Sequence, residues 1–162
     1  AEDVRRIMKD SRIGSYGALG LGLAVALRAS LLMSLPVVDQ PVWSAAAIIG
    51  SACFARLVVV AAMAFIPPVP TGTGLAKDIG GGVNAQTLLT GALTACPALA
   101  ALTLLHWPSL LGASVLAALF LIWLRGMLMR RIGGSTGDCL GFAAYAGQLI
   151  VLVAVVAANH GG

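Results

Sequence analysis

Long runs of apolar residues alternate with short polar breaks along this chain. A transmembrane helix needs about 20 consecutive apolar residues, because each residue advances the helix by about 1.5 Å. Five segments meet this requirement, and we expect each one to cross a membrane once. They are approximately residues 13–35, 42–66, 86–105, 108–129 and 138–158. The breaks between them contain proline or glycine, which end apolar helices, and the one between the third and fourth segments is His106-Trp107-Pro108.

The composition supports a bilayer as the solvent of this fold. Of 162 residues, 59% are hydrophobic and only 10% are charged. Soluble domains carry about a quarter charged residues, and a soluble fold of this length has too little interior to bury so much apolar surface. We therefore predict an all-α polytopic bundle of about five transmembrane helices, in one transmembrane domain over residues 1–162. Residues 1–12 are predicted to form an amphipathic helix before the first span.

The basic residues outside the spans predict the orientation. They fall in the N-terminal stretch, in the break after the second span and in the break after the fourth. The other breaks and the C-terminal tail contain no Lys or Arg. Because cytoplasmic loops of membrane proteins are enriched in Lys and Arg, this alternation predicts an inner-membrane protein with a cytoplasmic N-terminus. The same alternation explains the net charge of +4, because the basic residues mark the cytoplasmic side of the membrane. The positive charge therefore does not indicate a nucleic-acid partner, and we expect none.

Two further features bear on the class of protein. Cys53, Cys96 and Cys139 are far apart and lie in or beside apolar runs, so we expect free core thiols and no disulfide framework. The chain begins with Ala1 and has no signal-peptide pattern. We therefore expect an N-terminally truncated portion of a longer protein.

Three polar clusters fall on the predicted cytoplasmic side, at residues 9–17, 71–82 and 133–138. Each combines glycine with hydroxyl groups, a carboxylate and a nearby cation. Glycine-rich loops expose backbone N–H groups to phosphate, Lys and Arg supply countercharge, and Asp can hold Mg²⁺. Taken singly, each cluster also fits an ordinary turn with topogenic charges. Three together on one side favour an anionic ligand.

Arginines also lie within the predicted spans. A charge at this depth costs about 2.5–3.5 kcal/mol on insertion scales, so it normally faces a polar cavity or a partner. Arg56 is predicted to point into a cavity capped by the polar clusters, with snorkelling or a lipid-phosphate contact as the alternative. Arg28 is nearer the other end of its span, and for it the sequence favours snorkelling or a lipid-phosphate contact. Arg125, near a helix end, is predicted to snorkel.

Two motifs resemble the cobalamin synthase family, the adenosylcobinamide-GDP ribazoletransferases. The first is Ile-Met-Lys-Asp-Ser-Arg-Ile-Gly-Ser-Tyr-Gly at residues 7–17, and the second is Gly-Gly-Ser-Thr-Gly-Asp-Cys-Leu-Gly at residues 133–141. Their order and spacing also fit, and the resemblance covers essentially the whole chain. The family carries an Asp-rich motif further upstream that is absent from this sequence. Many of its members also have a Glu in the region where this chain has Tyr145 and Gln148.

The resemblance implies a function. It implies transfer of the phosphoryl-cobinamide group of adenosylcobinamide-GDP to α-ribazole or its 5′-phosphate, with release of GMP and with Mg²⁺ as cofactor. Asp10 and Asp138 would be catalytic groups, acting as secondary metal ligands or orienting a hydroxyl. Most metal ligands would come from the upstream Asp-rich motif, so the chain alone would be inactive. Phosphate-binding roles are implied for Lys9, Arg12, Arg56, Lys77, Gly134, Ser135, Thr136 and Gly137.

Two other functions remain open from the sequence. One is a CDP-alcohol phosphotransferase-like enzyme of phospholipid synthesis, although the signature carboxylates of that family are missing. The other is a small transport or scaffold subunit, which the short and nearly uncharged outer loops disfavour. The partners expected are the two substrates and the lipid bilayer, and a homo-oligomer is compatible with the pattern.

Overall fold

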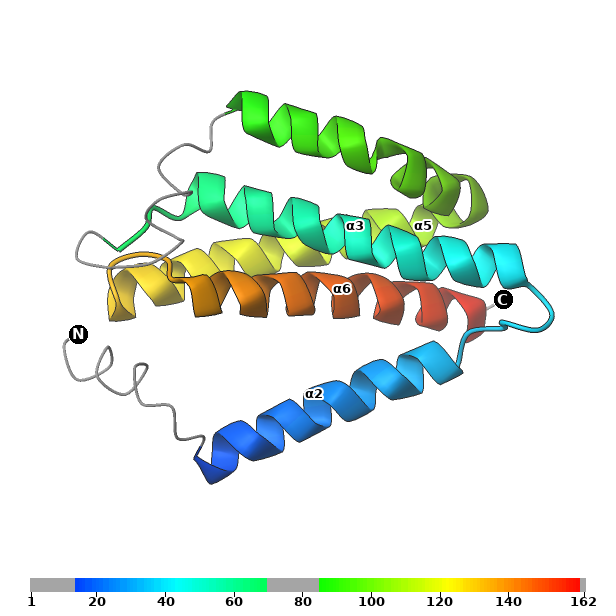
Figure 1. The fold of residues 1–162 in the computed structure, drawn as a ribbon, viewed down its shortest axis with the longest axis horizontal. Coiled ribbons are helices and arrows are strands. Elements are labelled where there is room, and N and C mark those ends of the chain that lie inside the picture. The colour runs from blue at the N-terminus through cyan, green and yellow to red at the C-terminus, as the bar shows by residue number, and fades with distance from the viewer. Residues whose placement is uncertain (1–13, 70–84, 161–162) are drawn as a thin grey trace.

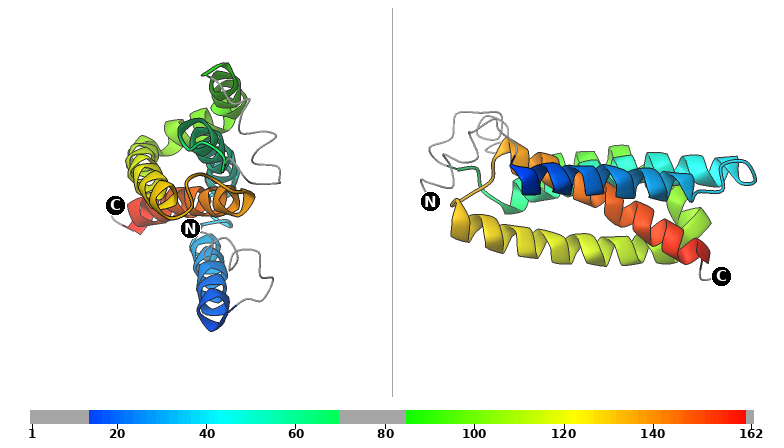
Figure 2. Two further views of the ribbon diagram at one scale, coloured as in Figure 1. Left: turned by 90° about the vertical axis from the view of Figure 1, so that its left-hand side faces the viewer. Right: turned by 90° about the horizontal axis from the view of Figure 1, so that it is seen from below.

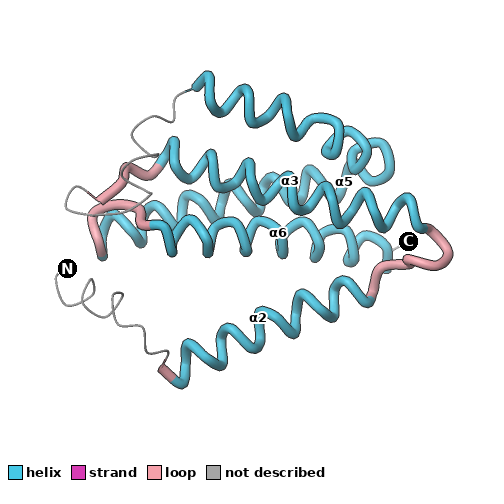
Figure 3. Tube along the Cα trace, viewed as in Figure 1, coloured by secondary structure: helices cyan, strands magenta, loops and turns pink. Residues whose placement is uncertain are grey.

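The described part of the protein is built from helices. A computed structural model describes residues 14–69 and 85–160. Its helices are α2 (Ser15–Met33), α3 (Pro41–Phe65), α5 (Ala85–Arg131) and α6 (Gly137–His160). Figures 1 and 3 show these helices and the loops that join them. Within the described ranges the only β-type pairing is one isolated bridge, between Pro68 and Ser135. The predicted all-α membrane bundle is therefore confirmed.

Helix α5 covers both the third and the fourth predicted spans, residues 86–105 and 108–129. The sequence predicts a break at residues 106–108, but the helical backbone continues through Pro97 and Pro108. The prediction of a non-helical break there is therefore wrong. The chain nevertheless reverses direction, since the green first part of α5 and its yellow-green to yellow second part run in opposite directions (Figure 1). Proline removes a backbone donor and clashes with the preceding turn, which allows a sharp bend while neighbouring residues stay helical.

Four helical segments of the described chain are long and apolar enough to cross a membrane. They are Ser15–Met33, Pro41–Phe65, Trp107–Arg131 and Gly137–Asn159, and the first part of α5 adds a shorter apolar helix, Leu89–Leu105. These five segments match the five predicted spans to within a few residues at each end. This chain is therefore a multi-pass membrane protein.

Helix α3 lies at the centre of the bundle and packs against both α5 and α6. Small residues bring the backbones close. A Cβ atom added at Gly50 would lie 3.3 Å from Leu102 Cβ on α5. One added at Gly147 would lie 3.0 Å from Val58 Cγ2 on α3. Close approach at small residues is how helices associate in a bilayer, where the apolar effect between helices is weak.

Helix α2 stands apart from this core. Leu31 is its one buried residue, and large side chains such as Leu19, Leu23 and Val25 are exposed. Its described polar link to the bundle is a hydrogen bond from the Tyr145 hydroxyl to the Ala24 carbonyl oxygen, at 2.9 Å. Figure 1 shows α2 diverging from the other helices toward its N-terminal end.

The helix termini divide between two ends of the bundle. We call one of them the motif end, because it carries the 133–138 turn. Figures 1 and 2 show there the starts of α2, α5 and α6 and the ends of α3 and α5. The α2–α3 loop, the bend of α5 and the end of α6 lie at the opposite end. Since the described ends of the basic breaks all lie at the motif end, this arrangement agrees with the sidedness inferred from the sequence.

Candidate functional site

The 133–138 turn at the motif end is held by a short backbone pairing with the residues that follow α3. The Ser135 N–H donates to the Pro67 carbonyl oxygen at 2.8 Å, and the Val69 N–H donates to the Ser135 carbonyl oxygen at 3.2 Å. The Ser135 hydroxyl donates to the Ile66 carbonyl oxygen at 3.2 Å. Ser135 is buried, and its backbone and side-chain polar groups all bond to this segment. The structure thus gives Ser135 a role in holding the turn, and its phosphate-binding role stays a prediction.

Two glycines make that pairing sterically possible. Gly133 has a φ of +78°, a left-handed conformation that other residues rarely adopt. A Cβ atom at Gly134 would lie 2.7 Å from the Pro67 carbonyl oxygen and 2.8 Å from the Val69 nitrogen. These distances are shorter than any ordinary contact of a Cβ atom. Glycine at residue 134 is therefore required by the approach of the two loops.

The remaining residues of the turn begin α6. The Thr136 carbonyl oxygen accepts the Leu140 N–H at 3.1 Å, and the Thr136 hydroxyl lies 3.2 Å from Cys139 Sγ. Gly137 and Asp138 are exposed, and Asp138 lies in the first turn of the helix. A carboxylate is stabilised at the positive end of a helix. Asp138 is thus an accessible anionic group at the motif end, able to orient a hydroxyl group or to contribute one ligand to a metal.

Several predicted site residues fall outside the described ranges. These are Lys9, Asp10, Arg12 and Lys77, and their roles stay predictions. The pairing of Val69 with Ser135 fixes the point at which the chain leaves α3 toward residue 70.

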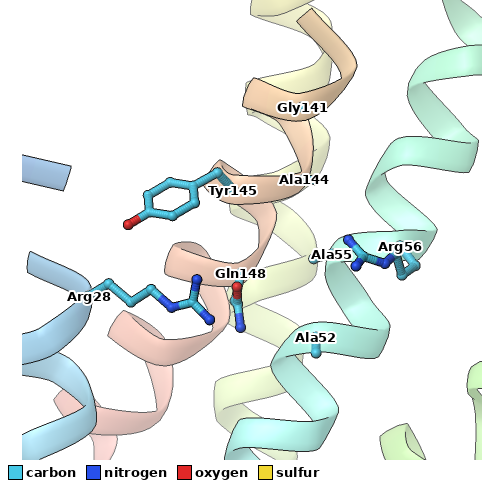
Figure 4. A pocket seen from close by; sticks show the side chains of 8 residues that line it. All are labelled: Arg28, Ala52, Ala55, Arg56, Gly141, Ala144, Tyr145 and Gln148. Atoms are coloured by element: carbon cyan, nitrogen blue, oxygen red, sulfur yellow. The ribbon is translucent and has the colours of Figure 1, made fainter. Parts of the chain in front are cut away.

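An open-sided cavity of about 310 Å³ lies between α2, α3 and α6, and its lining on α6 begins at Gly141, about one turn after the start of that helix. Two of its lining residues are arginines, Arg28 from α2 and Arg56 from α3. Figure 4 shows their side chains extending toward each other, with Gln148 of α6 between them. The remaining lining residues are Ala52, Ala55, Gly141, Ala144 and Tyr145.

Two intraspan arginines line this cavity. Arg56 is one of its lining residues, and the capping of the cavity by the polar clusters stays a prediction. Arg28 lines the same cavity, and its guanidinium carbon lies 5.8 Å from the centroid of the Tyr145 ring. The Tyr145 ring is a neighbour of Arg28 that the sequence of α2 alone does not reveal. The snorkelling or lipid-phosphate contact that the sequence favours for Arg28 stays a prediction.

The cavity begins close to the 133–138 turn and runs along α6 away from it. At 1.5 Å per residue, its lining extends from Gly141, about 6 Å along α6 from Gly137, to Gln148, about 16 Å from Gly137. The sequence reasoning missed Tyr145 and Gln148 as lining residues. A signal existed, because Gly141, Tyr145 and Gln148 follow a helical spacing of four and three residues and so share one face.

Comparison with known proteins identifies the family. The cobalamin-5-phosphate synthase family matches residues 1–156. This chain belongs to that family. The resemblance carried by the two motifs is thereby confirmed.

Curated relatives of this cobalamin-5-phosphate synthase family member carry one name, adenosylcobinamide-GDP ribazoletransferase. A protein from Sinorhizobium is 36% identical over 154 residues, covering 92% of this chain and 57% of that protein. One from Shewanella baltica is 35% identical over 157 residues, covering 93% and 56%. One from Brucella ovis is 35% identical over 157 residues, covering 94% and 58%. The chain thus spans somewhat more than half the length of these relatives, and no solved structure matches it.

The described part of this family member offers few metal ligands. Within residues 14–69 and 85–160, no group of three or more His, Cys, Asp or Glu side chains is placed to hold a metal ion. The carboxylates of these ranges are Asp39, in the α2–α3 loop, and Asp138, at the motif end. Since they lie at opposite ends of the bundle, the described residues by themselves do not form a Mg²⁺ site.

Proposed function

We propose that the full-length protein containing this chain transfers the phosphoryl-cobinamide group of adenosylcobinamide-GDP to α-ribazole or its 5′-phosphate. The observation that carries the proposal is the family match over residues 1–156, together with relatives named for this reaction. The exposed Asp138 beside a tightly held glycine-rich turn supports it, because it supplies an accessible polar group at the motif end.

The proposed reaction exchanges one bond to phosphorus for another. A hydroxyl oxygen of the ribazole attacks the phosphorus that is bonded to cobinamide. The bond from that phosphorus to the oxygen bridging to GMP breaks, so GMP leaves with the bridging oxygen. The proton of the attacking hydroxyl passes to solvent. In such transfers the protein contributes chiefly by positioning the groups and by stabilising charge on the phosphate oxygens.

We assign roles to this chain's residues accordingly. Asp138 orients the acceptor hydroxyl group or donates one metal ligand, together with Asp10. The cations Lys9, Arg12 and Lys77 contact phosphate oxygens. The pairing of Ser135 with Pro67 keeps the first turn of α6 fixed relative to the end of α3. Because a substrate must contact several elements at once, this rigidity favours catalysis.

Mg²⁺ dependence is part of the proposal for the full-length protein. When bound, Mg²⁺ would neutralise charge on the diphosphate. A Mg²⁺ ion usually takes one or two protein carboxylates together with substrate phosphates and water. Asp138 fits such a secondary ligand. The described residues do not provide the remainder.

The location follows from the same reasoning. We propose the inner membrane, with the N-terminus and the motif end in the cytoplasm, where nucleotide-activated substrates are found. The basic Arg130 and Arg131 at the end of α5 support this orientation.

The decisive experiment compares two carboxylates at opposite ends of the bundle. In membranes with the full-length protein, adenosylcobinamide-GDP, α-ribazole and Mg²⁺, we expect formation of the cobalamin product and GMP. We expect Asp138→Asn to lower turnover about 10–100-fold, as loss of a supporting ligand typically does. The matched control is Asp39→Asn, which removes a carboxylate from the opposite end and should leave turnover unchanged. No product from the unaltered full-length protein would refute the proposed reaction, and equal effects of the two variants would refute the role of Asp138.

A further inference from the structure

We propose that the cavity between α2, α3 and α6 is an anion site within the membrane depth, in which Arg28 and Arg56 together bind a phosphate group. The proposal stands independently of the transferase reaction, because it requires neither a reacting group nor the carboxylate at the motif end. It rests on the charge, the held geometry and the size of this cavity.

The first argument is uncompensated charge. Arg28 and Arg56 bring two positive charges to one cavity, and the residues that line it include no Asp or Glu. Elsewhere in the described ranges, the carboxylates Asp39 and Asp138 lie near the two ends of the bundle. Arg28 is half-buried and Arg56 is exposed, so both guanidinium groups are accessible to a ligand. A cation at this depth of a bilayer costs about 2.5–3.5 kcal/mol, and two like charges repel. A bound anion lowers both costs.

The second argument is that Arg28 is held in place. Its guanidinium group lies against the Tyr145 ring, with 5.8 Å between the guanidinium carbon and the ring centroid. The ring is itself fixed, because its hydroxyl donates to the Ala24 carbonyl oxygen at 2.9 Å. Ala24 lies one turn before Arg28 on α2. The aromatic ring orients the cation without neutralising it, so the guanidinium keeps its charge for a ligand.

The third argument is space and shape. The four smallest lining residues, on α3 and α6, are Ala52, Ala55, Gly141 and Ala144. Their small side chains leave open the volume between the arginines. Gln148 adds an amide group between the two cations, which can donate a further hydrogen bond (Figure 4). A volume of about 310 Å³ is at the lower end for small-molecule pockets. It has room for a phosphate group and part of the group attached to it.

The chemistry of guanidinium selects phosphate. Its planar fork of donors matches two oxygens of one phosphate group, and two forks facing each other can bind several oxygens of a phosphodiester or a diphosphate. Such a group can come from a membrane phospholipid that enters between the helices. It can also come from a soluble phosphorylated molecule that enters from the motif end.

The experiment measures both sources on the full-length protein. In one arm, the protein in phosphatidylcholine nanodiscs is titrated with inorganic pyrophosphate and the dissociation constant is measured. In the other arm, native mass spectrometry counts phosphatidylglycerol molecules retained by the detergent-solubilised protein. Arg28→Gln and Arg56→Gln are compared with Arg125→Gln. Arg125 is the matched control, since it is an exposed intraspan arginine that does not line the cavity.

We expect one arm to show specific binding that weakens about tenfold in Arg28→Gln and in Arg56→Gln, as loss of a charge-assisted hydrogen bond does. Arg125→Gln should bind like the unaltered protein. Loss of pyrophosphate binding would identify a soluble phosphate, and loss of retained phosphatidylglycerol would identify a lipid. If neither probe binds the two cavity variants more weakly than it binds Arg125→Gln, the proposal is wrong.

A second pair of variants guards against misfolding. Arg28→Lys and Arg56→Lys keep the charge and remove the planar fork, and circular dichroism reports whether each variant keeps its helix content. A phosphate site requires binding by the Lys variants to be weaker than that of the unaltered protein and stronger than that of the Gln variants. Equal binding by folded Lys and Gln variants would show that the cavity does not bind the anion through these cations.

Discussion

Among the described glycines, Gly134 is the one at which an added Cβ atom would lie closest to the backbone of another segment. A Cβ atom there would overlap the Pro67 carbonyl oxygen, at 2.7 Å, and the backbone of the following residues. We predict that Gly134→Ala destabilises the protein by about 1–3 kcal/mol, because the two loops must separate to admit the methyl group. The measurement is the midpoint of thermal unfolding in detergent, followed by circular dichroism.

Gly126→Ala is the control for this prediction. Gly126 lies inside α5, and a Cβ atom added there meets nothing within 4 Å. Alanine favours helix over glycine by about 0.8–1.0 kcal/mol, so this variant should be as stable as the unaltered protein or more so. A Gly134→Ala variant as stable as Gly126→Ala would contradict the close pairing of the loops.

At the residue scale, the sequence indicates which residues are important. It does not indicate which residues they contact in the folded chain. The 133–138 motif is readable as a glycine-rich turn. Its partner, Pro67–Val69, is more than 60 residues away in sequence, and no local pattern predicts that pairing. The sequence likewise marks Arg28 and Arg56 as unusual intraspan charges. That they share a cavity depends on how α2, α3 and α6 pack, which only the folded chain decides.

At the scale of the elements, the contact between α3 and α6 depends on Gly147. A Cβ atom there would lie 3.0 Å from Val58 Cγ2 and 3.4 Å from Ala55 Cα. We predict that Gly147→Ala lowers stability, and that adding Val58→Ala to it restores part of the loss by removing the opposing methyl groups. A double-mutant cycle on the unfolding free energy should give a favourable coupling of about 0.5–3 kcal/mol. Purely additive effects would show that the two helices do not meet at these residues.

The elements themselves were largely predictable from the sequence. Spans such as 42–66 and 138–158 match α3 and α6 closely, because a bilayer demands a continuous apolar run that composition reveals directly. The continuity of α5 was not predictable. Pro108 belongs to the predicted break at residues 106–108, and a helix that reverses direction while keeping its backbone helical requires packing neighbours to stabilise it.

At the scale of the whole molecule, the two ends of the bundle predict from which side of the membrane an engineered cysteine can be labelled. We expect Gln40→Cys and Asn159→Cys, in a background without the three natural cysteines, to react with a membrane-impermeant thiol reagent added from the periplasm. Gly80→Cys should react only after the membrane is opened. The reason is that Val69, the last described residue before this part of the chain, lies at the motif end, which we propose to be cytoplasmic. Gln40 and Asn159 are both exposed; Gln40 directly precedes α3 and Asn159 is in the last turn of α6, and both of these helix ends lie opposite the motif end. Labelling of Gly80→Cys from the periplasm would overturn the proposed orientation.

The last prediction concerns what the 162-residue chain does by itself. A Mg²⁺ site for phosphoryl transfer needs carboxylates held close together. The sequence has six acidic residues, and the two neighbours Glu2 and Asp3 would point about 100° apart on the predicted helix. Asp39 and Asp138 lie at opposite ends of the bundle. We therefore predict that membranes containing this chain alone form no cobalamin from adenosylcobinamide-GDP, α-ribazole and Mg²⁺.

The control for that assay is the full-length protein, which under the proposed function turns over in the same membranes. A second measurement separates lack of folding from lack of a metal site: the chain alone should keep its helical circular dichroism and a cooperative thermal transition. If the chain folds and its turnover approaches that of the full-length protein, the metal site lies within these residues. Asp10 and Asp138 would then be the first ligands to test, by substitution of each with Asn.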